Sequence, residues 1–385
     1  MMKNVLLAII ICLTGCFADN SAFVINSAHK INVDFDILTK SKPRPNNDIF
    51  KTIRYIPLET RDDVLISGVD KILYSNSCFY ILDSNSIFIF DKNGKFINCI
   101  SKVGNGPREY LGINCFDLDK DGNVYIYDNH SSKIIKYGRD ENDYEEIKMK
   151  NYFEEFAVVD RGLILRNVYN YKGIISHISY YDFQTEKIKE LIGKDAYHDD
   201  FELARHSRFS IFRSNQHLHF HARFTGSIYR IDEPDTTTPL IKIHGPMPPE
   251  KDLVEFKDIR FTLDSRTSGY ILDINNIYEN SLFYSVNINK NFGYTLLISK
   301  KDSITANLLL GLGPLNKDYL GSYHSIFGVA EDEFISLLNP ARELEANWME
   351  RVDRTSLSEE EKQTLLNLKQ DDNPVLALLQ FNDIQ

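Results

Sequence analysis

A hairpin pattern between residues 79 and 137 decides the fold of this chain. It begins with three short runs, FYILD at 79–83, IFIF at 87–90 and, after the turn DKNG, FINCI at 96–100. About 45 residues later the pattern returns as VYIYD at 124–128, followed by IIKY at 134–137. Runs rich in β-branched and aromatic residues, bounded by Gly, Asn and Asp, indicate strands joined by tight turns. Recurrence at about 40 to 50 residues predicts the four-stranded blades of a β-propeller.

The same unit continues along the chain with weakening fidelity. Six starts lie at residues 79, 124, 163, 218, 282 and 334, and we interpret them as the inner strands of six blades. A second repeat supports this interpretation, because GxGP followed by YLG occurs at 104–112 and again at 311–321. Each copy lies between an outer strand and the start of the next unit. The sequence therefore predicts an all-β protein, a six-bladed β-propeller over residues 50–385.

The two ends of the chain are expected to meet in the last blade, because a ring of sheets has to close. Residues 53–58 are one candidate for the N-terminal strand, and the alternating run 31–35 is another. Residues 375–381 are expected to form the final strand of the sixth blade.

A helical insertion is expected before that final strand, at about residues 341–370. Ser358 and Glu361 have the spacing of a capping box, and leucines at 365, 366 and 368 supply an apolar face.

The N-terminus resembles a bacterial lipoprotein signal. Lys3 precedes an apolar run over 5–13, and Leu-Thr-Gly-Cys at 13–16 resembles the lipobox, whose cysteine becomes the acylated first residue. The apolar run is too short for a bilayer core, which needs about 20 helical residues. We expect a signal peptide at 1–15, lipid on Cys16, and a tether and N-terminal extension over 16–49. The alternative is an ordinary secretory signal with an incidental cysteine. Lipid anchoring implies the cell envelope, and we expect the outer membrane.

Composition limits the partners. The 385 residues are 43% hydrophobic and 12% aromatic, which excludes disorder over most of the chain. The net charge of −11 is spread along the sequence, so we expect no nucleic acid partner and no headgroup binding by a basic patch. Cys78, Cys99 and Cys115 remain after the signal, an odd number without metal-ligand spacing, and we expect buried thiols with at most one disulfide.

Four stretches resemble the bacterial six-bladed β-propeller lipoproteins of the NHL-like group. They are IPLE at 56–59, GNGPREY at 104–110, DGNVYIYD at 121–128 and DNPVL at 372–376. The resemblance covers roughly residues 50–381 and is clearest in the first two blades and at the C-terminus. It implies the propeller fold and an envelope location, and it carries over no catalytic residue.

A histidine strand is the main candidate ligand site. His217, His219 and His221 alternate along one face of a predicted strand, and Arg223 continues that face. We expect His219 and His221 to face the channel or its mouth and to contact a polar ligand; inert surface is the alternative. Alternate residues lie about 6–7 Å apart, so two imidazoles could share a metal ion. We expect no metal and no cofactor, although Asp232 and Glu233 nearby keep the metal alternative open.

Two other motifs have simpler interpretations. Asp117, Asp119, Asp121 and Gly122, with Asp128 at position twelve, match a calcium loop, but the strand that follows favours a plain hairpin turn. The Gly104–Gly106 run lacks the Lys-Ser/Thr of a phosphate loop and is interpreted as a corner between blades.

Signatures of catalytic nucleophiles are missing from the sequence. We therefore favour a binding or scaffold module for a glycan, a peptide or a partner protein of the envelope, and an enzyme is less favoured. One alternative is an NHL-like propeller enzyme of lyase or hydrolase type, which requires His, Tyr or acidic groups that converge at one mouth of the channel. Another is a component of envelope assembly or signalling without a small ligand.

Replacing Cys16 with Ser should release the protein from membranes without unfolding it, because the acyl chains provide the attachment. Metabolic labelling with a fatty-acid analogue measures this directly. A Cys12→Ser variant, altered within the same leader, should keep the label. Wild-type protein that takes up no label would contradict the lipobox interpretation.

Overall fold

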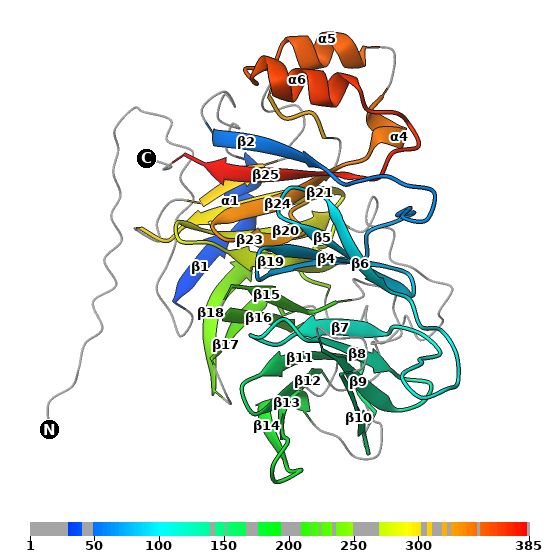
Figure 1. The fold of residues 1–385 in the computed structure, drawn as a ribbon. Coiled ribbons are helices and arrows are strands. Elements are labelled where there is room, and N and C mark those ends of the chain that lie inside the picture. Colours follow the sequence, from blue (N-terminus) through cyan, green and yellow to red (C-terminus); the bar gives the residue numbers. More distant parts are fainter. Residues whose placement is uncertain are drawn as a thin grey trace, which may run out of the picture.

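The computed structural model describes residues 30–40, 49–138, 143–150, 152–166, 176–193, 209–215, 217–222, 225–232, 236–248, 269–301, 306–309, 318–321, 325–344 and 347–382. Over these residues the strands form six small sheets, arranged as the blades of a six-bladed β-propeller (Figure 1). The predicted fold class is therefore confirmed. Residues 1–29, with the expected signal and Cys16, lie outside the described residues.

The first three blades follow the chain from the innermost strand outward. Blade one contains β3 (Lys71–Ser75), β4 (Cys78–Asp83), β5 (Ser86–Asp91) and β6 (Phe96–Ile100). Blade two contains β7 (Cys115–Leu118), β8 (Val124–Asp128), β9 (Lys133–Tyr137) and β10 (Tyr144–Lys148). Blade three contains β11 (Glu155–Val159), β12 (Gly162–Arg166), β13 (Ser176–Asp182) and β14 (Ile188–Gly193).

The other three blades include both ends of the described chain. Blade four contains β15 (Ile211–Ser214), β16 (His217–Ala222), β17 (Ser227–Asp232) and β18 (Thr236–His244), with β1 (Ile31–Asp34) outside them. Blade five contains β19 (Asp273–Glu279), β20 (Phe283–Lys290), β21 (Phe292–Ser299) and β22 (Ala306–Leu309). Blade six contains β23 (Gly328–Ala330), β24 (Glu333–Leu338), β25 (Val375–Phe381) and β2 (Phe50–Pro57).

The six predicted starts belong to the second strand of each blade, which corrects their interpretation as inner strands. The innermost strands are β3, β7, β11, β15, β19 and β23, and each contacts the next around the ring. These strands lack a clear apolar run because polar residues interrupt them. Asp117 in β7 and Glu155 in β11 are examples, and both side chains are buried.

These buried acids fasten one blade to the next. Asp117 accepts a hydrogen bond from the backbone N–H of Val158 in blade three at 2.7 Å. Glu155 accepts the backbone N–H of Ser210, at the entry to blade four, at 2.7 Å. Burial raises the pKa of Glu155, although the nearby charge of Arg166 opposes the shift. A buried acceptor that lost these donors would destabilise the junction by about 1–3 kcal/mol.

The apolar core is divided among the junctions between blades. Phe79 and Ile81 of blade one pack with Ile335 of blade six, and Leu82 of blade one packs with Ile126 of blade two. Similar clusters join blades two to three and three to four, and a larger one joins blades four, five and six. Burial of one such side chain stabilises the fold by about 1.5–3 kcal/mol, so every blade depends on its neighbours.

The ring closes in blade six, where the two ends of the chain share one sheet. β2 pairs antiparallel with β25, with Ile53 opposite Leu379. The expected strands at 53–58 and 375–381 are therefore confirmed in this blade. Asn373, just before β25, holds the junction: its amide donates to the carbonyls of Glu59 and Val64 at 2.8 Å, and its Oδ1 accepts the Ile66 N–H at 2.8 Å.

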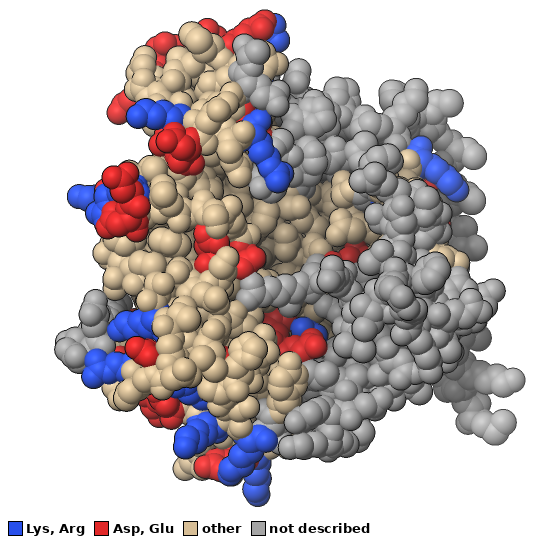
Figure 2. Space-filling model, turned by 90° about the vertical axis from the view of Figure 1, so that its right-hand side faces the viewer, with Lys and Arg blue, Asp and Glu red and all other residues tan. Residues whose placement is uncertain are grey.

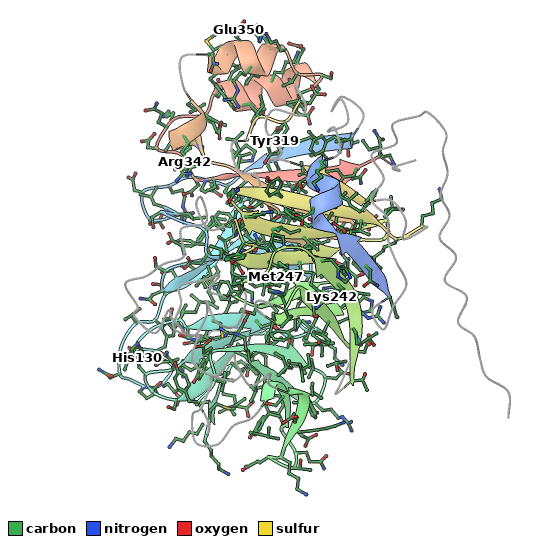
Figure 3. The ribbon with its side chains drawn as sticks, turned by 180° about the vertical axis from the view of Figure 1, so that it is seen from behind. His130, Lys242, Met247, Tyr319, Arg342 and Glu350 are labelled. Atoms are coloured by element: carbon green, nitrogen blue, oxygen red, sulfur yellow. The ribbon has the colours of Figure 1, made fainter. Side chains whose placement is uncertain are left out.

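The run at 31–35 serves another blade and does not close the ring. β1 pairs parallel with β18, so it adds a fifth strand to the outer edge of blade four, beside Lys242 (Figures 1 and 3). The chain continues into α1 (Phe35–Lys40), whose Phe35 ring meets that of Tyr294 edge-on at 5.3 Å. Residues Ile31–Asp34, which lie before the expected boundary at residue 50, are therefore part of a blade.

The helical insertion is confirmed between β24 and β25. It consists of α4 (Pro340–Glu343), α5 (Trp348–Asp353) and α6 (Glu359–Leu366), and Figure 1 shows it at the periphery, beyond β2 and β25. The capping box of Ser358 and Glu361 forms as expected. Trp348 fixes α5 to α6, because its indole Nε1 donates to the Leu365 carbonyl at 3.2 Å. Among the described helices, none has the length and apolar character that crossing a membrane requires.

The strands FYILD and VYIYD both end in an aspartate, and the two aspartates have the same structural role. Asp83 accepts the N–H of Ser67 at 2.6 Å, and Asp128 accepts the N–H of Leu111 at 2.9 Å. In both blades the last residue of the second strand therefore holds the segment that leads into its own blade. Burial alone would raise the pKa of Asp128, but hydrogen bonds from Ser131, Leu111 and His130 bring it below the usual value.

The calcium-like and phosphate-like motifs form turns. Asp119 accepts the N–H groups of Asp121 and Asn123 at 3.0 and 2.9 Å, which makes the hairpin turn before β8. The Gly104 N–H donates to the carbonyl of Tyr110 at 2.9 Å, which closes the corner between blades one and two. The second GxGP copy, at 311–314, lies outside the described residues.

Replacing Asn373 with Ala should lower the free energy of unfolding of the whole propeller by about 3 kcal/mol. The reason is that three backbone groups of the closing segment lose their buried partner at once. Urea denaturation measures the loss. Asn93→Ala, at an exposed turn position, should change stability by less than about 0.5 kcal/mol. Equal stability of the Asn373 variant and wild type would show that the closure does not depend on this side chain.

Candidate functional site

Four inner strands end around a hollow of about 690 Å³, which we call the mouth. The C-terminal ends of β3, β7, β11 and β15 reach it, so it opens at one end of the ring axis. Its wall includes the aromatic side chains Tyr74, Tyr125 and Phe183 and the polar side chains Lys136, Asp160 and His217. A concave surface built by several blades is the usual form of a ligand site on a propeller.

Every lysine and arginine that lines the mouth, among the described residues, faces an acidic partner. The pairs are Arg213–Asp117 at 2.6 Å, Lys120–Asp160 at 3.1 Å and Lys136–Asp119 at 3.9 Å. Asp232, also in the wall, pairs with Arg230 at 2.8 Å. The mouth is therefore rich in hydrogen-bonding groups but has little unbalanced charge.

Tyr125 gives the mouth an aromatic surface that stays uncharged. Its hydroxyl donates to Asp119 at 3.4 Å, and the Lys136 ammonium lies 5.6 Å from its ring centroid. Burial raises the pKa of Tyr125, and the charge of Asp119 raises it further. Phe183, half-buried in the same wall, adds a second aromatic side chain.

The predicted histidine strand is β16, and only one of its histidines lies at the mouth. The His217 side chain is 42% exposed and contributes to the wall. His219 and His221 are buried, with 0% and 3% of their surface exposed. These two side chains lie in the interior and are not among the residues that line the mouth. Arg223 lies outside the described residues, and ligand contact by the strand stays a prediction.

Glu279, at the end of β19, brings two of the histidines together. Its Oε1 lies 3.6 Å from Nε2 of His219 and 3.8 Å from Nε2 of His217. The other carboxylate oxygen pairs with the Lys300 ammonium at 2.5 Å. The Glu279 N–H donates to Ser214 at 2.9 Å, which fixes the end of β19 against blade four. Sequence reasoning missed Glu279 because only the order of the blades places β19 beside β16.

Two members of this cluster lack hydrogen-bond partners. Among the residues that the structure describes, neither imidazole nitrogen of His219 has a hydrogen-bond partner, nor does Oε1 of Glu279, although both side chains are buried. Burial lowers the pKa of His219 to about 4, against the opposing effect of the Glu279 charge, so the ring is neutral at pH 7. An unpaired buried polar group costs about 1–3 kcal/mol. Such groups are rare in native structures and are explained by stored strain, by a catalytic role or by an ordered water or ion.

Lys300 limits what the cluster can hold. Its ammonium already neutralises Glu279, so a metal ion beside that carboxylate would meet a like charge. Throughout the described part of the chain, no group of three His, Cys, Asp or Glu side chains is placed to hold a metal ion.

Within the described residues, none of the three cysteines outside the leader forms a disulfide; Cys115 is buried, whereas Cys78 and Cys99 are half-buried. Burial raises the pKa of Cys115 to about 12 and that of Cys99 to about 11. Both thiols are therefore protonated and unreactive at neutral pH, as expected for structural cysteines.

Stability should fall as the pH drops from 7.5 to 5, and His219 should account for about 2 kcal/mol of the fall. The unfolded imidazole, with a pKa of about 6.5, takes up a proton in this range, whereas the folded one does not. The stabilising contribution of His219 is fully present at pH values above the pKa of the unfolded imidazole. It is lost as the pH falls toward the pKa of the folded imidazole. Urea denaturation of wild type and His219→Phe at both pH values tests this. An identical pH dependence of the two proteins would contradict it.

Comparison with solved structures shows the fold. A Bacteroides fragilis protein described as exported superposes with a TM-score of 0.71 at 19% identity, over 86% of this chain and 95% of that one. A Bacteroides vulgatus member of the DUF4221 family has a TM-score of 0.49 at 10% identity, over 89% and 100% of the two chains. Virginiamycin B lyase from Staphylococcus aureus has a TM-score of 0.40 at 14% identity, over 74% and 80%.

The search of curated proteins found no match. A model of one family, the Domain of unknown function DUF4934, matches residues 29–380, from just before β1 to the end of β25. The match therefore covers both the ring and the strand that precedes it, and this chain belongs to the DUF4934 family.

Proposed function

We propose that this chain is a lipid-anchored protein of the cell envelope whose propeller binds a polar ligand at the mouth. The ligand is a glycan, a peptide or a segment of a partner protein. One observation carries the proposal: inner-strand ends from four blades converge on a hollow with aromatic and hydrogen-bonding walls. Sites of this construction recognise ligands through a few oriented polar groups on an apolar surface.

The location rests on the sequence of the leader. The apolar run and the Leu-Thr-Gly-Cys stretch support export and acylation of Cys16. The outer membrane is the proposed destination. The similar Bacteroides fragilis protein is also described as exported, which agrees with this proposal. β1 lies at the outer edge of blade four, so the tether would join the ring at its side and leave the mouth accessible.

Charge argues against nucleic acid as the partner. The net charge is −11, and Figure 2 shows basic and acidic side chains interspersed over the described part of the visible face. Binding to phosphate backbones needs a continuous basic surface.

An NHL-like lyase or hydrolase is the second candidate, and the histidine–glutamate cluster favours it. His217 lies in the wall of the mouth, with the Glu279 carboxylate 3.8 Å behind it. A carboxylate in that position could orient an imidazole that accepts a proton from a bound substrate. The separation is longer than a hydrogen bond, however, so we rank binding first.

Replacing Phe183 or His217 with Ala should weaken ligand binding at least tenfold, because each change removes part of the wall of the mouth. Detergent-solubilised full-length protein, screened against arrayed glycans and peptides, provides the ligand and its Kd. His130→Ala is the matched control, since this exposed histidine (labelled in Figure 3) follows β8 and is not among the residues that line the mouth. A ligand that binds the Phe183 and His217 variants as tightly as wild type would place the site elsewhere.

A further inference from the structure

A second hollow, of about 360 Å³, lies between blades one and two, and we call it the crevice. Strands β4, β5 and β6 form one wall, and the start of β8 and the end of β9 form the other. The β7–β8 turn borders both hollows, because Asp121 lines the mouth and Gly122 lines the crevice. The volume of the crevice falls within the range of small-molecule sites, about 300–1,000 Å³.

The walls of the crevice are mainly apolar and partly open to solvent. Four buried side chains of the apolar cluster that joins the two blades line it, namely Tyr80, Ile100, Val124 and Tyr137. Ile89 is half-buried in the same wall, and Ile97 is 52% exposed. The crevice is therefore an open edge of the apolar core. An apolar body that covered it would remove this surface from water, which is favourable.

Lys102 places a positive charge in this apolar wall. Its ammonium lies 5.5 Å from the ring centroid of Tyr137, a distance at which a cation and an aromatic face attract each other. The backbone of Lys102 is fixed, since its N–H donates to the Tyr110 hydroxyl at 3.0 Å and its carbonyl accepts the Tyr110 N–H at 3.0 Å. These contacts restrict the position of the ammonium, so a ligand would lose less free energy in ordering it.

The charge of Lys102 is not balanced within the described part of the chain. No Asp or Glu lines the crevice, and no described carboxylate forms an ion pair with the Lys102 ammonium. The mouth differs, because each of its described basic side chains faces an acid. The crevice therefore has a positive charge that an anionic group could neutralise.

Asn98 adds a second hydrogen-bond donor to the crevice. Its Oδ1 accepts the Cys99 N–H at 2.8 Å, which leaves the side-chain NH₂ group without an acceptor among the described residues. One ammonium and one amide NH₂ match the two oxygens of a carboxylate. A phosphate monoester fits less well, because it carries up to about two charges and three acceptor oxygens.

We propose that the crevice binds a small carboxylate with an apolar body. The carboxylate pairs with Lys102 and accepts from Asn98, while the body packs against Tyr80, Ile89 and Ile97. The crevice has room for about a dozen non-hydrogen atoms, at the ~30 Å³ that a group the size of a water molecule occupies in a liquid. This site is separate from the mouth and does not depend on the function proposed there.

The first experiment tests the chemistry of the ligand. Full-length protein in detergent is titrated by calorimetry at pH 7.5 with 4-phenylbutanoate and with decanoate, both of about this size, and detergent alone is the blank. We expect at least one of them to bind with a Kd of about 1 mM or tighter. The amide and the amine of the same body should bind at least tenfold more weakly. Raising NaCl from 50 to 500 mM should raise the Kd about threefold, because salt screens a half-exposed ion pair.

The second experiment tests the role of Lys102. Lys102→Met keeps the apolar stem without the charge and should weaken carboxylate binding at least tenfold, whereas Lys102→Arg keeps the charge and should recover most of the affinity. Lys51→Met is the matched control, because it removes the charge of an exposed lysine of β2 outside the crevice. This control should change the Kd less than twofold.

A substitution at the rim provides an independent variant. Ile97→Asp places a negative charge in the wall at an exposed position, so it should repel the carboxylate and weaken binding at least tenfold while the protein stays folded. Ile188→Asp, at an isoleucine of β14 that is 43% exposed and outside the crevice, is the control and should bind as wild type does.

Four results would overturn the proposal. Neither carboxylate binds at 10 mM, or the neutral amide binds as tightly as the carboxylate. In the third, Lys102→Met and Ile97→Asp keep wild-type affinity, with their folding confirmed by circular dichroism. In the fourth, Phe183→Ala removes carboxylate binding and Lys102→Met does not, which would place the carboxylate in the mouth. That last result would support a ligand site at the mouth and contradict one in the crevice.

Discussion

The pairing of β2 with β25 is the contact on which the rest of the propeller depends. Each blade buries its apolar residues against the next, so an open ring would leave two sheet faces exposed to water at the junction of blades six and one. The closing sheet takes one strand from each end of the chain. Asn373 joins that sheet to the segment entering blade one, and its hydrogen bonds therefore connect sequence ends more than 300 residues apart.

The sequence predicted the fold where the local pattern and the packing agree. The second strands, such as FYILD and VYIYD, are apolar on both faces because neighbouring blades cover both, and they stand out as runs. The capping box and the apolar residues of α6 identified the insertion in the same way. The innermost strands were not predicted from the sequence, because they contain buried acids such as Glu155. The hydrogen-bond donor of Glu155 lies at the entry to the next blade. The role of β1 was missed too, since alternation along a strand does not identify its partner.

The candidate site shows the same limit. His217 could be chosen from the alternating histidines, but nothing near it in the sequence points to Glu279 or Lys300, which come from blade five. Two buried acids at blade junctions make a useful contrast. Glu155 is surrounded by donors, namely two backbone N–H groups and Arg166, and so it joins blade three to blade four. Glu279 keeps one oxygen without a donor, beside a neutral histidine and next to the mouth. A buried carboxylate oxygen without a donor is rare in native structures, so Glu279 needs an explanation that Glu155 does not.

If the proposed lipid anchor holds the protein by its N-terminus, the attachment of β1 to blade four has a mechanical consequence. Tension applied through the tether would reach β1 first, which is joined to β18 by only four paired residues. Peeling this strand away leaves β18 as the edge of a four-stranded blade and does not touch the sheet that closes the ring. The force would then meet α1, whose Phe35 and Leu38 are buried, before it reached blade six. β1 would thus act as a releasable fastening, which protects the propeller from load while the binding surface keeps its shape.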